Sequence, residues 1–169
     1  MAQSQQAETR RTPAASRPMM PGYGVPESDE GMLPWSHAIE RLAAAKNYWV
    51  VTADGDGRPH AIPVWGAWVE GTLYFGAGPR SARNLAENPA VCIHLESGDD
   101  VVIVQGRAEV VHGPGEALSK AIDDDIAKKY DWRPSTEGED TVGEGMYALH
   151  PAVAYAWKSF PADATRWRF

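Results

Sequence analysis

The sequence contains a single cysteine, Cys92, among 169 residues, and this excludes an internal disulfide. One free cysteine is typical of a reducing compartment, so we expect a cytoplasmic protein. No apolar run approaches the ~18 residues that a membrane-spanning helix needs, so we expect no membrane partner. Lys and Arg number 16 against 23 Asp and Glu, which gives a formal net charge of -7. Nucleic-acid-binding proteins usually present a basic face, so we expect no nucleic-acid partner either.

The sequence also lacks the spaced Cys, His and carboxylate ligands of a metal site. His60, His94, His112 and His150 each stand alone in a predicted strand, and none has a second ligand at a metal-binding spacing. A Ser-His-Asp signature, a P-loop and a dinucleotide-binding glycine motif are all missing. We therefore expect no metal ion, and the sequence identifies no catalytic residue.

The length suits one folded domain preceded by an arm. Residues 1–30 are rich in Gln, Ser, Ala, Pro and Gly without an apolar period, which predicts a disordered or loosely ordered N-terminal arm. An alternative is an arm that crosses onto a partner subunit. Residues 31–169 form the predicted folded domain.

Apolar alternation and Asp-Gly turns predict six antiparallel strands in this domain. The strands are expected at 47–53, 58–71, 73–77, 90–97, 101–112 and 145–160, and helices near 35–43, 81–88 and 114–130. Pro63 cannot donate to a strand ladder, so the second strand needs a bulge or an unpaired edge. Asp123–Asp125 should lie on the water-facing side of the third helix. The pattern predicts a mainly β fold, a small closed or partly closed barrel with peripheral helices.

The stretch GPRSARNLAENP, residues 78–89, gathers Arg80, Ser81, Arg83 and Asn84 at the start of a predicted helix. Ser81 is a good N-cap, and the helix start would present free N–H groups and a positive dipole end. The two arginines can converge on one anion, with Asn84 as a neutral donor. A capped surface helix with solvated arginines would have the same residues, so both interpretations remain open.

The order of these segments resembles the pyridoxamine 5'-phosphate oxidase-like, flavin-binding split-barrel superfamily, and in particular its actinobacterial branch of enzymes that use the deazaflavin coenzyme F-420. The resemblance extends from about Ile39 to the C-terminus. Its motifs are DGRPH-x-x-PVW, RNL-x-x-NP, ESGDDVV and the terminal TRWRF. It implies a six-stranded antiparallel split β-barrel that forms a homodimer, with F-420 or FMN bound in grooves at the subunit interface.

The resemblance also implies a set of cofactor-binding residues. The cofactor phosphate would be bound by Arg80, Ser81, Arg83 and Asn84, and the tricyclic ring would lie against Ala61, Ile62, Pro63, Val64 and Trp65. In relatives the end of the last strand packs near the partner's cofactor, which adds Trp157 and Arg166. Trp157 and Trp167 could equally fill the barrel core.

Two features depart from the family pattern. Many relatives carry an additional cation between the positions of Arg80 and Arg83, where this chain has Ser81 and Ala82. Arg58 could compensate, or it could be a solvated turn residue. The terminal TRWRF is not followed by the arginine-containing stretch that binds pyridoxal in true pyridoxamine phosphate oxidases, so vitamin B6 oxidation is not expected.

By the resemblance, the chain would be an oxidoreductase that transfers hydride between the bound cofactor and a small conjugated organic substrate. The alternatives are a non-catalytic binder of a flavin, deazaflavin or haem-like ligand, and a structural dimer with a vestigial groove.

Overall fold

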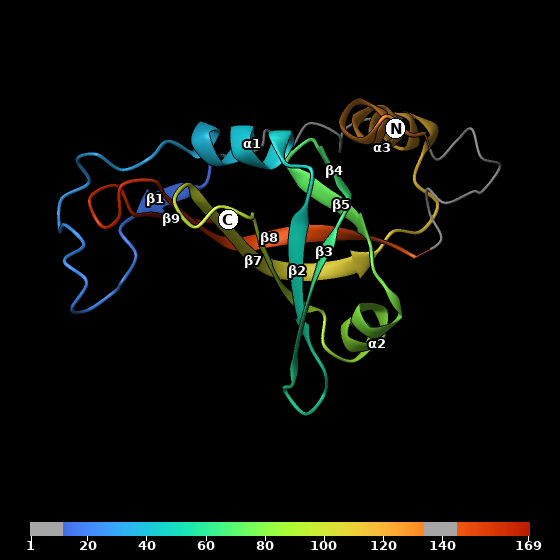
Figure 1. The fold of residues 1–169 in the computed structure, drawn as a ribbon, viewed down its shortest axis with the longest axis horizontal. Coiled ribbons are helices and arrows are strands. Elements are labelled where there is room, and N and C mark those ends of the chain that lie inside the picture. The colour runs from blue at the N-terminus through green and yellow to red at the C-terminus, as the bar shows by residue number, and fades with distance from the viewer. Residues whose placement is uncertain (1–11, 134–144) are drawn as a thin grey trace, which may run out of the picture.

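An antiparallel sheet of nine strands dominates the fold (Figure 1). The structure is a computed structural model that describes residues 12–133 and 145–169. The strands are β1 (Ala14–Ser16), β2 (Tyr48–Ala53), β3 (Pro59–Val64), β4 (Gly66–Val69), β5 (Thr72–Gly76), β6 (Ala90–His94), β7 (Val101–Val110), β8 (Met146–Trp157) and β9 (Thr165–Arg168). The helices are α1 (Trp35–Ala44), α2 (Pro79–Glu87) and α3 (Glu116–Tyr130). The predicted mainly β architecture with peripheral helices is confirmed.

The long strand β8 joins the two parts of the sheet. The path runs β1-β9-β8-β7-β6-β2-β3, and the β4–β5 hairpin attaches to β8 through β5. The register shifts between Gln105 and Gly106, where a Cβ on Gly106 would stand 2.1 Å from the His150 carbonyl oxygen. Glycine is therefore required at this bulge. Among the described residues the path ends at β1 and β3 without closing, which agrees with a split barrel.

The nine strands exceed the six predicted for two reasons. The predicted strand 58–71 divides at Trp65 into β3 and β4. The other additions are β1 and β9, which pair with each other in the register Ala14↔Arg168. Each of these strands is short, and paired residues such as Ser16 and Arg166 lie 150 positions apart, so neither strand has a local signal.

Turn chemistry fixes the two hairpins where the sequence predicts them. Between β2 and β3, Gly57 has a φ of 81°, and the Asp54 carboxylate accepts the backbone N–H groups of Asp56 and Arg58 at 3.0 and 2.9 Å. Between β4 and β5, Glu70 and Gly71 have φ values of 49° and 77°. These left-handed conformations turn the chain tightly enough for neighbouring strands to pair.

Side chains from both parts of the sheet and from α1 fill one core. Its largest fully buried members are Trp167, Tyr48, Phe75, Leu42, Leu73 and Ile93. Trp167 is 1% exposed, so the structure confirms it as a core residue. Burial of each large apolar side chain contributes about 1.5–3 kcal/mol to folding.

Residues 12–30, the described part of the predicted arm, are held on the domain. β1 pairs with β9, and Arg17 donates to four backbone carbonyls, those of Ser28, Glu30, Ala162 and Ala164. This differs from a loosely ordered arm, because one guanidinium satisfies carbonyls from two segments that are distant in sequence. Residues 1–11 lie outside the described residues.

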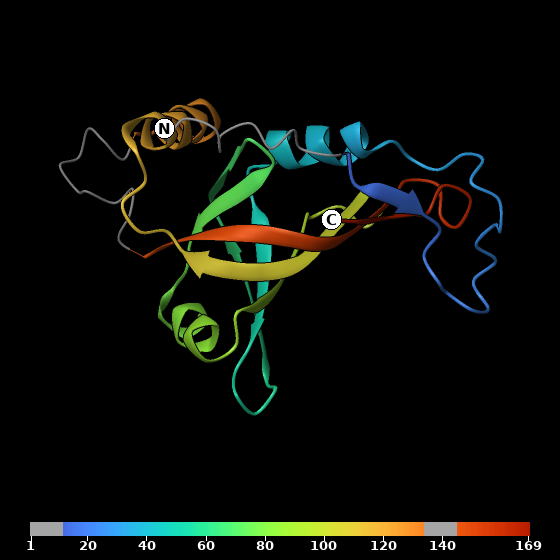
Figure 2. The same ribbon diagram turned by 180° about the vertical axis from the view of Figure 1, so that it is seen from behind.

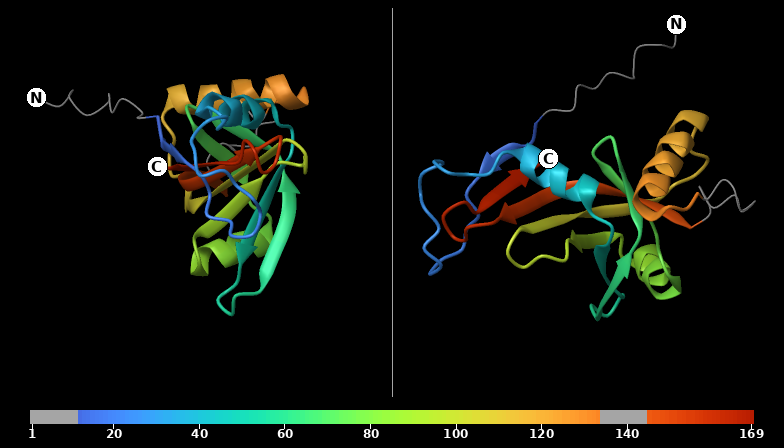
Figure 3. Two further views of the ribbon diagram at one scale, coloured as in Figure 1. Left: turned by 90° about the vertical axis from the view of Figure 1, so that its left-hand side faces the viewer. Right: turned by 45° about the horizontal axis from the view of Figure 1, so that its top comes forward.

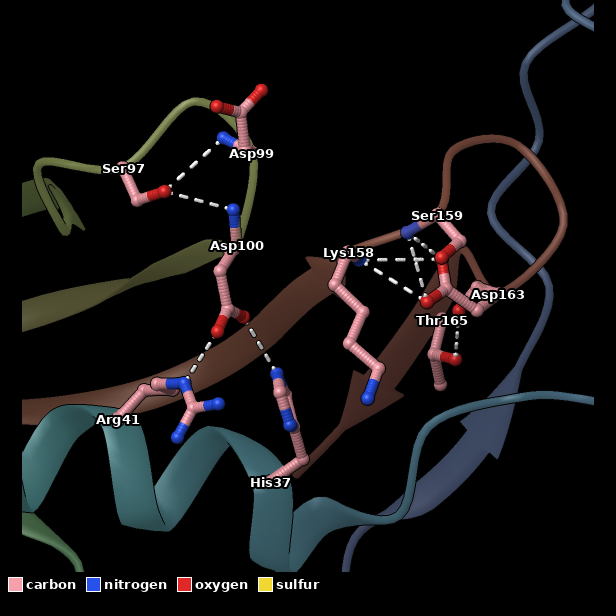
Figure 4. A network of polar contacts seen from close by, with 9 residues as sticks. All are labelled: His37, Arg41, Ser97, Asp99, Asp100, Lys158, Ser159, Asp163 and Thr165. Carbon is pink, nitrogen blue, oxygen red and sulfur yellow. Dashed lines mark hydrogen bonds and ion pairs between the residues drawn. The ribbon is translucent and has the colours of Figure 1, made fainter.

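Helix α1 is fastened to the β6–β7 loop by Asp100 (Figure 4). One Asp100 carboxylate oxygen lies 2.8 Å from His37 Nε2, and the other accepts a hydrogen bond from Arg41 Nε at 2.5 Å. The Ser97 hydroxyl orders the loop by accepting the backbone N–H groups of Asp99 and Asp100 at 3.1 and 2.8 Å. Burial acts to raise the pKa of Asp100, but the bonds from Arg41 and His37 outweigh it, so this pKa lies below its ordinary value.

Helix α3 covers β4 with carboxylates on its packed side. Asp123 is buried and pairs with Arg133, and Asp125 accepts the backbone N–H of Trp68 at 2.9 Å. The prediction that Asp123–Asp125 faces water is therefore wrong for these two residues, which act as hydrogen-bond partners for elements that pack on the helix. No helix in the described part of the chain combines the length and apolar character needed to cross a membrane.

Candidate functional site

The N-terminus of α2 presents backbone donors without a side-chain cap. The helix begins at Pro79 after an N-cap at Gly78, and the first helical hydrogen bond runs from Ala82 N to Gly78 O at 2.9 Å. Proline is favoured at the first helical position because it has no N–H to satisfy. Ser81 is therefore the third residue of the helix, and its predicted N-cap role is wrong. The N–H groups of Arg80 and Ser81 precede the first helical donor and point out of the helix end.

The side chains of this first turn divide into one buried hydroxyl and two free cations. Ser81 is 1% exposed, and its Oγ has no hydrogen-bond partner in the described residues. Arg80 and Arg83 are exposed, and neither forms an ion pair within residues 12–133 and 145–169. Burying a hydroxyl without a hydrogen-bond partner costs about 1–3 kcal/mol. A ligand that accepts a hydrogen bond from Ser81 Oγ would remove this cost.

Asn84 anchors α2 to the sheet. It is 2% exposed, and its Nδ2 donates to Thr52 Oγ1 at 3.0 Å, so the residue predicted as a phosphate donor is committed to β2. His60 of β3 lies directly opposite Thr52 in the register and therefore on the same face of the sheet. His60 is half-buried.

Strand β3 is an edge strand beside this helix. It pairs with β2 along Tyr48↔Val64 to Ala53↔Pro59, and no other strand in the described residues pairs with it. Pro63 is therefore accommodated by the unpaired-edge alternative. Ala61 and Pro63 are exposed on one face, and the half-buried members of the strand are His60, Ile62 and Val64. The predicted ring-binding strand thus has a free backbone edge.

Arg58 and Trp65 lie at the two ends of β3 and already have neighbours. Arg58 pairs with Asp56 at 2.7 Å and with Asp54 at 3.5 Å, which fits the solvated-turn interpretation. Trp65 is 55% exposed and stacks on Tyr130 of α3, with ring centroids 4.4 Å apart and an interplanar angle of 10°. Neither side chain contacts α2 through a hydrogen bond in the described structure.

Trp157 and Arg166 lie at the other end of the molecule from α2. Trp157 ends β8 and packs its ring against Phe160 at 5.5 Å, and Arg166 of β9 donates to Ser16 Oγ at 3.1 and 2.9 Å. Figures 1 and 2 and the right-hand view of Figure 3 show β9 and α2 at opposite ends of the long strands. One copy of the chain therefore does not bring these two groups of predicted site residues together.

A second polar cluster connects α3 to the sheet. Lys129 Nζ lies 2.8 Å from Asp125 Oδ2 and 2.9 Å from the Tyr48 hydroxyl. Burial lowers the pKa of Lys129, against the raising effect of Asp125, and burial raises the pKa values of Tyr48 and Tyr130. Sequence reasoning missed this cluster, because Lys128 and Lys129 look alike in the helix and only packing buries the second.

No cluster of three or more metal-ligating side chains occurs in the described portion of the chain.

The α2 start does fit a phosphate monoester. Two free guanidinium groups, uncapped N–H groups and an orphaned buried hydroxyl are the donors that such a group accepts. The site residues that would hold it are Arg80, Ser81 and Arg83.

Comparisons with solved structures show the same fold in proteins that differ in sequence. A haem-binding protein from Mycobacterium smegmatis is 19% identical with a TM-score of 0.59, over 83% of this chain and 58% of that one. An F420 reductase is 23% identical with a TM-score of 0.51, over 68% and 94%. A FAD-binding protein from Mesorhizobium loti is 17% identical with a TM-score of 0.57, over 79% and 93%.

A comparison with curated proteins finds no match. The family model described as pyridoxamine 5'-phosphate oxidase matches residues 36–158, which include β2 to β8, α2, α3 and all of α1 after Trp35. The match covers most of the chain and contains the α2 site and the edge strand β3. The chain belongs to the pyridoxamine 5'-phosphate oxidase family.

Proposed function

We propose that this protein is an oxidoreductase that binds FMN or F-420 by its phosphate at the start of α2 and transfers hydride to or from a small conjugated organic substrate. The single observation that carries the proposal is the buried, unpartnered Ser81 hydroxyl between the free cations Arg80 and Arg83. Each charge-assisted bond from an arginine to a phosphate contributes about 1.5–3 kcal/mol to binding. Family membership and the fold neighbours named for F420 and FAD agree with a flavin-type cofactor.

The cofactor, when bound, supplies the hydride chemistry, and the chain supplies position and exclusion of water. Strand β3 offers its unpaired edge and its exposed Ala61 and Pro63 as an irregular but rigid wall for the ring. Holding donor and acceptor in contact can contribute up to ~7–11 kcal/mol to catalysis. No proton donor is assigned, and solvent can supply the proton.

The distribution of free cations favours FMN over F-420. F-420 carries an anionic polyglutamate tail, which needs basic residues at the groove mouth beyond the phosphate site. Arg58 is paired with Asp54 and Asp56, so β3 adds no free cation to those of α2. Arg80 and Arg83 remain as free cations beside α2, which suits a cofactor that ends at its phosphate.

A homodimer would complete the site. The sheet carries a cross-strand row of half-buried or exposed side chains, formed by Pro63, Trp49, His94, Ile103, Tyr155, Arg166 and Ser16. A second copy related by a two-fold axis through the middle of this row would reverse its direction. Ser16 and Arg166 of one subunit would then lie beside Pro63 and Trp49 of the other, respectively. In this arrangement the β9 end of the partner subunit would contribute to the cofactor site. The free Cys92 fits a cytoplasmic location of the dimer.

The experiment that tests the function is a parallel titration of purified protein with FMN, F-420 and riboflavin. We expect at least one phosphate-bearing cofactor to bind at least tenfold more tightly than riboflavin, which has the ring but no phosphate. Equal affinity for FMN and riboflavin, with no binding of F-420, would refute the phosphate site. If a cofactor binds and no acceptor accelerates its oxidation, the chain is a non-catalytic binder.

A further inference from the structure

Trp65 presents one ring face to solvent at the end of β3. Its other face is covered by the Tyr130 ring, which lies almost parallel at a centroid distance of 4.4 Å. Trp132 stands beside it at 6.4 Å with an interplanar angle of 55°, so it forms a wall at the side of the stack. These three side chains, Trp65, Tyr130 and Trp132, are named the aromatic platform here. An indole that is 55% exposed is unusual because water contact with so large an apolar surface is costly.

The Tyr130 ring of the platform is held in place by its hydroxyl. Tyr130 donates to Lys46 O at 2.6 Å and accepts the Gly66 backbone N–H at 2.9 Å. Gly66 directly follows Trp65, so the same bond fixes the backbone that carries the indole. The exposed ring face is therefore preorganised, and a ligand that stacks on it has little side-chain entropy to remove.

Helix α3, which ends at Tyr130, is itself fixed to the sheet. Lys129 is 9% exposed, and its Nζ lies 2.8 Å from Asp125 Oδ2 and 5.3 Å from the centre of the Tyr48 ring. Asp125 also accepts the Trp68 backbone N–H at 2.9 Å. The hydrogen bonds of this ion pair to Trp68 and Tyr48 tie α3 to β4 and β2, so Tyr130 cannot move away from Trp65 without breaking a charged network.

We propose that the aromatic platform is the binding surface for the substrate, and that it selects a planar aromatic or conjugated molecule that stacks on the free face of Trp65. The proposal rests on the proposed function, since the platform follows directly on the strand that would lie against the cofactor ring. Aromatic faces favour flat partners in offset stacks because both dispersion and the ring quadrupole reward the parallel contact. A saturated molecule of equal size gains burial but no stacking.

The test measures binding of two neutral probes to the cofactor-free protein by ligand-observed NMR. 2-Naphthol is flat, and decahydro-2-naphthol has the same carbon skeleton and hydroxyl without the flat ring. We expect wild-type protein to prefer 2-naphthol by about three- to tenfold. Trp65→Ala should remove this preference, and Trp65→Phe, which keeps a smaller ring, should retain part of it. Tyr23→Ala is the matched control, because Tyr23 is 66% exposed and packs edge-on against Phe160 away from the platform.

Affinities for FMN and F-420 are measured on the same variants, so that the two proposals fail separately. If neither cofactor binds wild-type protein, the proposed function fails, and the naphthol preference still decides whether the platform recognises flat ligands. An unchanged preference in folded Trp65→Ala would overturn the platform. So would a loss of cofactor affinity in that variant as large as the loss of 2-naphthol affinity, because the surface would then hold the cofactor. A change in sedimentation coefficient without a change in naphthol binding would assign the surface to a subunit contact and overturn the proposal.

Discussion

The amide of Asn84 donates to the hydroxyl of Thr52 across the space between α2 and β2, at 3.0 Å, with both residues 2% exposed. This bond sets the position of α2 on the sheet, and with it the position of the adjacent Arg83 and of Arg80 one turn away. Within the family motif, Asn84 therefore has a structural role because it holds the helix on the sheet. The arginines of the motif would face the proposed ligand.

Replacing Thr52 by Val keeps the shape of the side chain and removes the acceptor. We expect the free energy of unfolding to fall by about 1–3 kcal/mol, because the Asn84 amide stays buried without its partner. Urea denaturation followed by tryptophan fluorescence measures the change. Thr72→Val is the control, since the Thr72 hydroxyl makes no hydrogen bond in the described residues and lies half-exposed at the start of β5. Equal effects of the two substitutions would show that the bond contributes nothing specific.

Removing the Arg83 guanidinium should weaken cofactor binding without unfolding the protein. Arg83→Ala is expected to lower the affinity for the phosphate-bearing cofactor by at least about 1 kcal/mol, close to fivefold, while riboflavin affinity stays constant. Lys128→Ala, an exposed cation on α3, provides the control for a general change in charge. An unchanged FMN or F-420 affinity in folded Arg83→Ala would contradict a phosphate contact from this residue.

Ser81→Ala should move stability and binding in opposite directions. In the cofactor-free protein the substitution removes a buried hydroxyl that lacks a partner, so the free energy of unfolding should stay constant or rise by about 1 kcal/mol. In the complex it removes a donor to the phosphate, so affinity should fall about fivefold. Thermal melting with and without cofactor measures both effects. A destabilised apo protein would mean that the hydroxyl already has a partner, which would remove the main support for the anion site.

The parts of the fold that sequence could predict depend on local chemistry. The hairpins follow from Gly57 and Gly71. Both have positive φ angles, as an Asp-Gly or Glu-Gly pair between two strands predicts. The edge position of β3 follows from Pro63, which cannot donate to a second neighbour. In each case the deciding interaction lies within a few residues of the signal.

The parts that could not be predicted depend on distant partners. Pairing of β1 with β9 joins residues 150 positions apart, and a three-residue strand such as Ala14–Ser16 has too little alternation to be recognised. Ser81 was expected to cap α2, but Pro79 starts the helix two residues earlier. The burial of Lys129 depends on Tyr48 from the far part of the chain. The sequence was enough to propose Arg80 and Arg83 as part of an anion site. Only the fold shows that neither arginine forms an ion pair among the described residues.

Protonation of Asp100 should release α1 at low pH. Because its pKa is lower in the folded protein than in the unfolded chain, this carboxylate stabilises the fold above the unfolded pKa of about 4, and the stabilisation is lost as the pH falls through the folded value. Asp100→Asn should therefore destabilise the protein by about 1–2 kcal/mol at pH 7, and this difference should shrink only once the pH falls below the unfolded pKa of about 4. Urea unfolding across this range measures the difference. Asp99→Asn is the matched control, because the neighbouring Asp99 side chain has no partner among the described residues (Figure 4).

Disruption of the cross-strand row should separate the subunits and weaken cofactor binding together. Ile103 lies in the middle of this row, and a carboxylate there would be buried against its counterpart in the proposed two-fold interface. We expect Ile103→Glu to be a folded monomer by sedimentation velocity, with cofactor affinity reduced at least tenfold, because α2 and β9 then no longer meet across subunits. Met19→Glu, at a residue that is 86% exposed on the arm, should leave both properties unchanged. A monomeric Ile103→Glu with full affinity would show that one copy holds the cofactor alone.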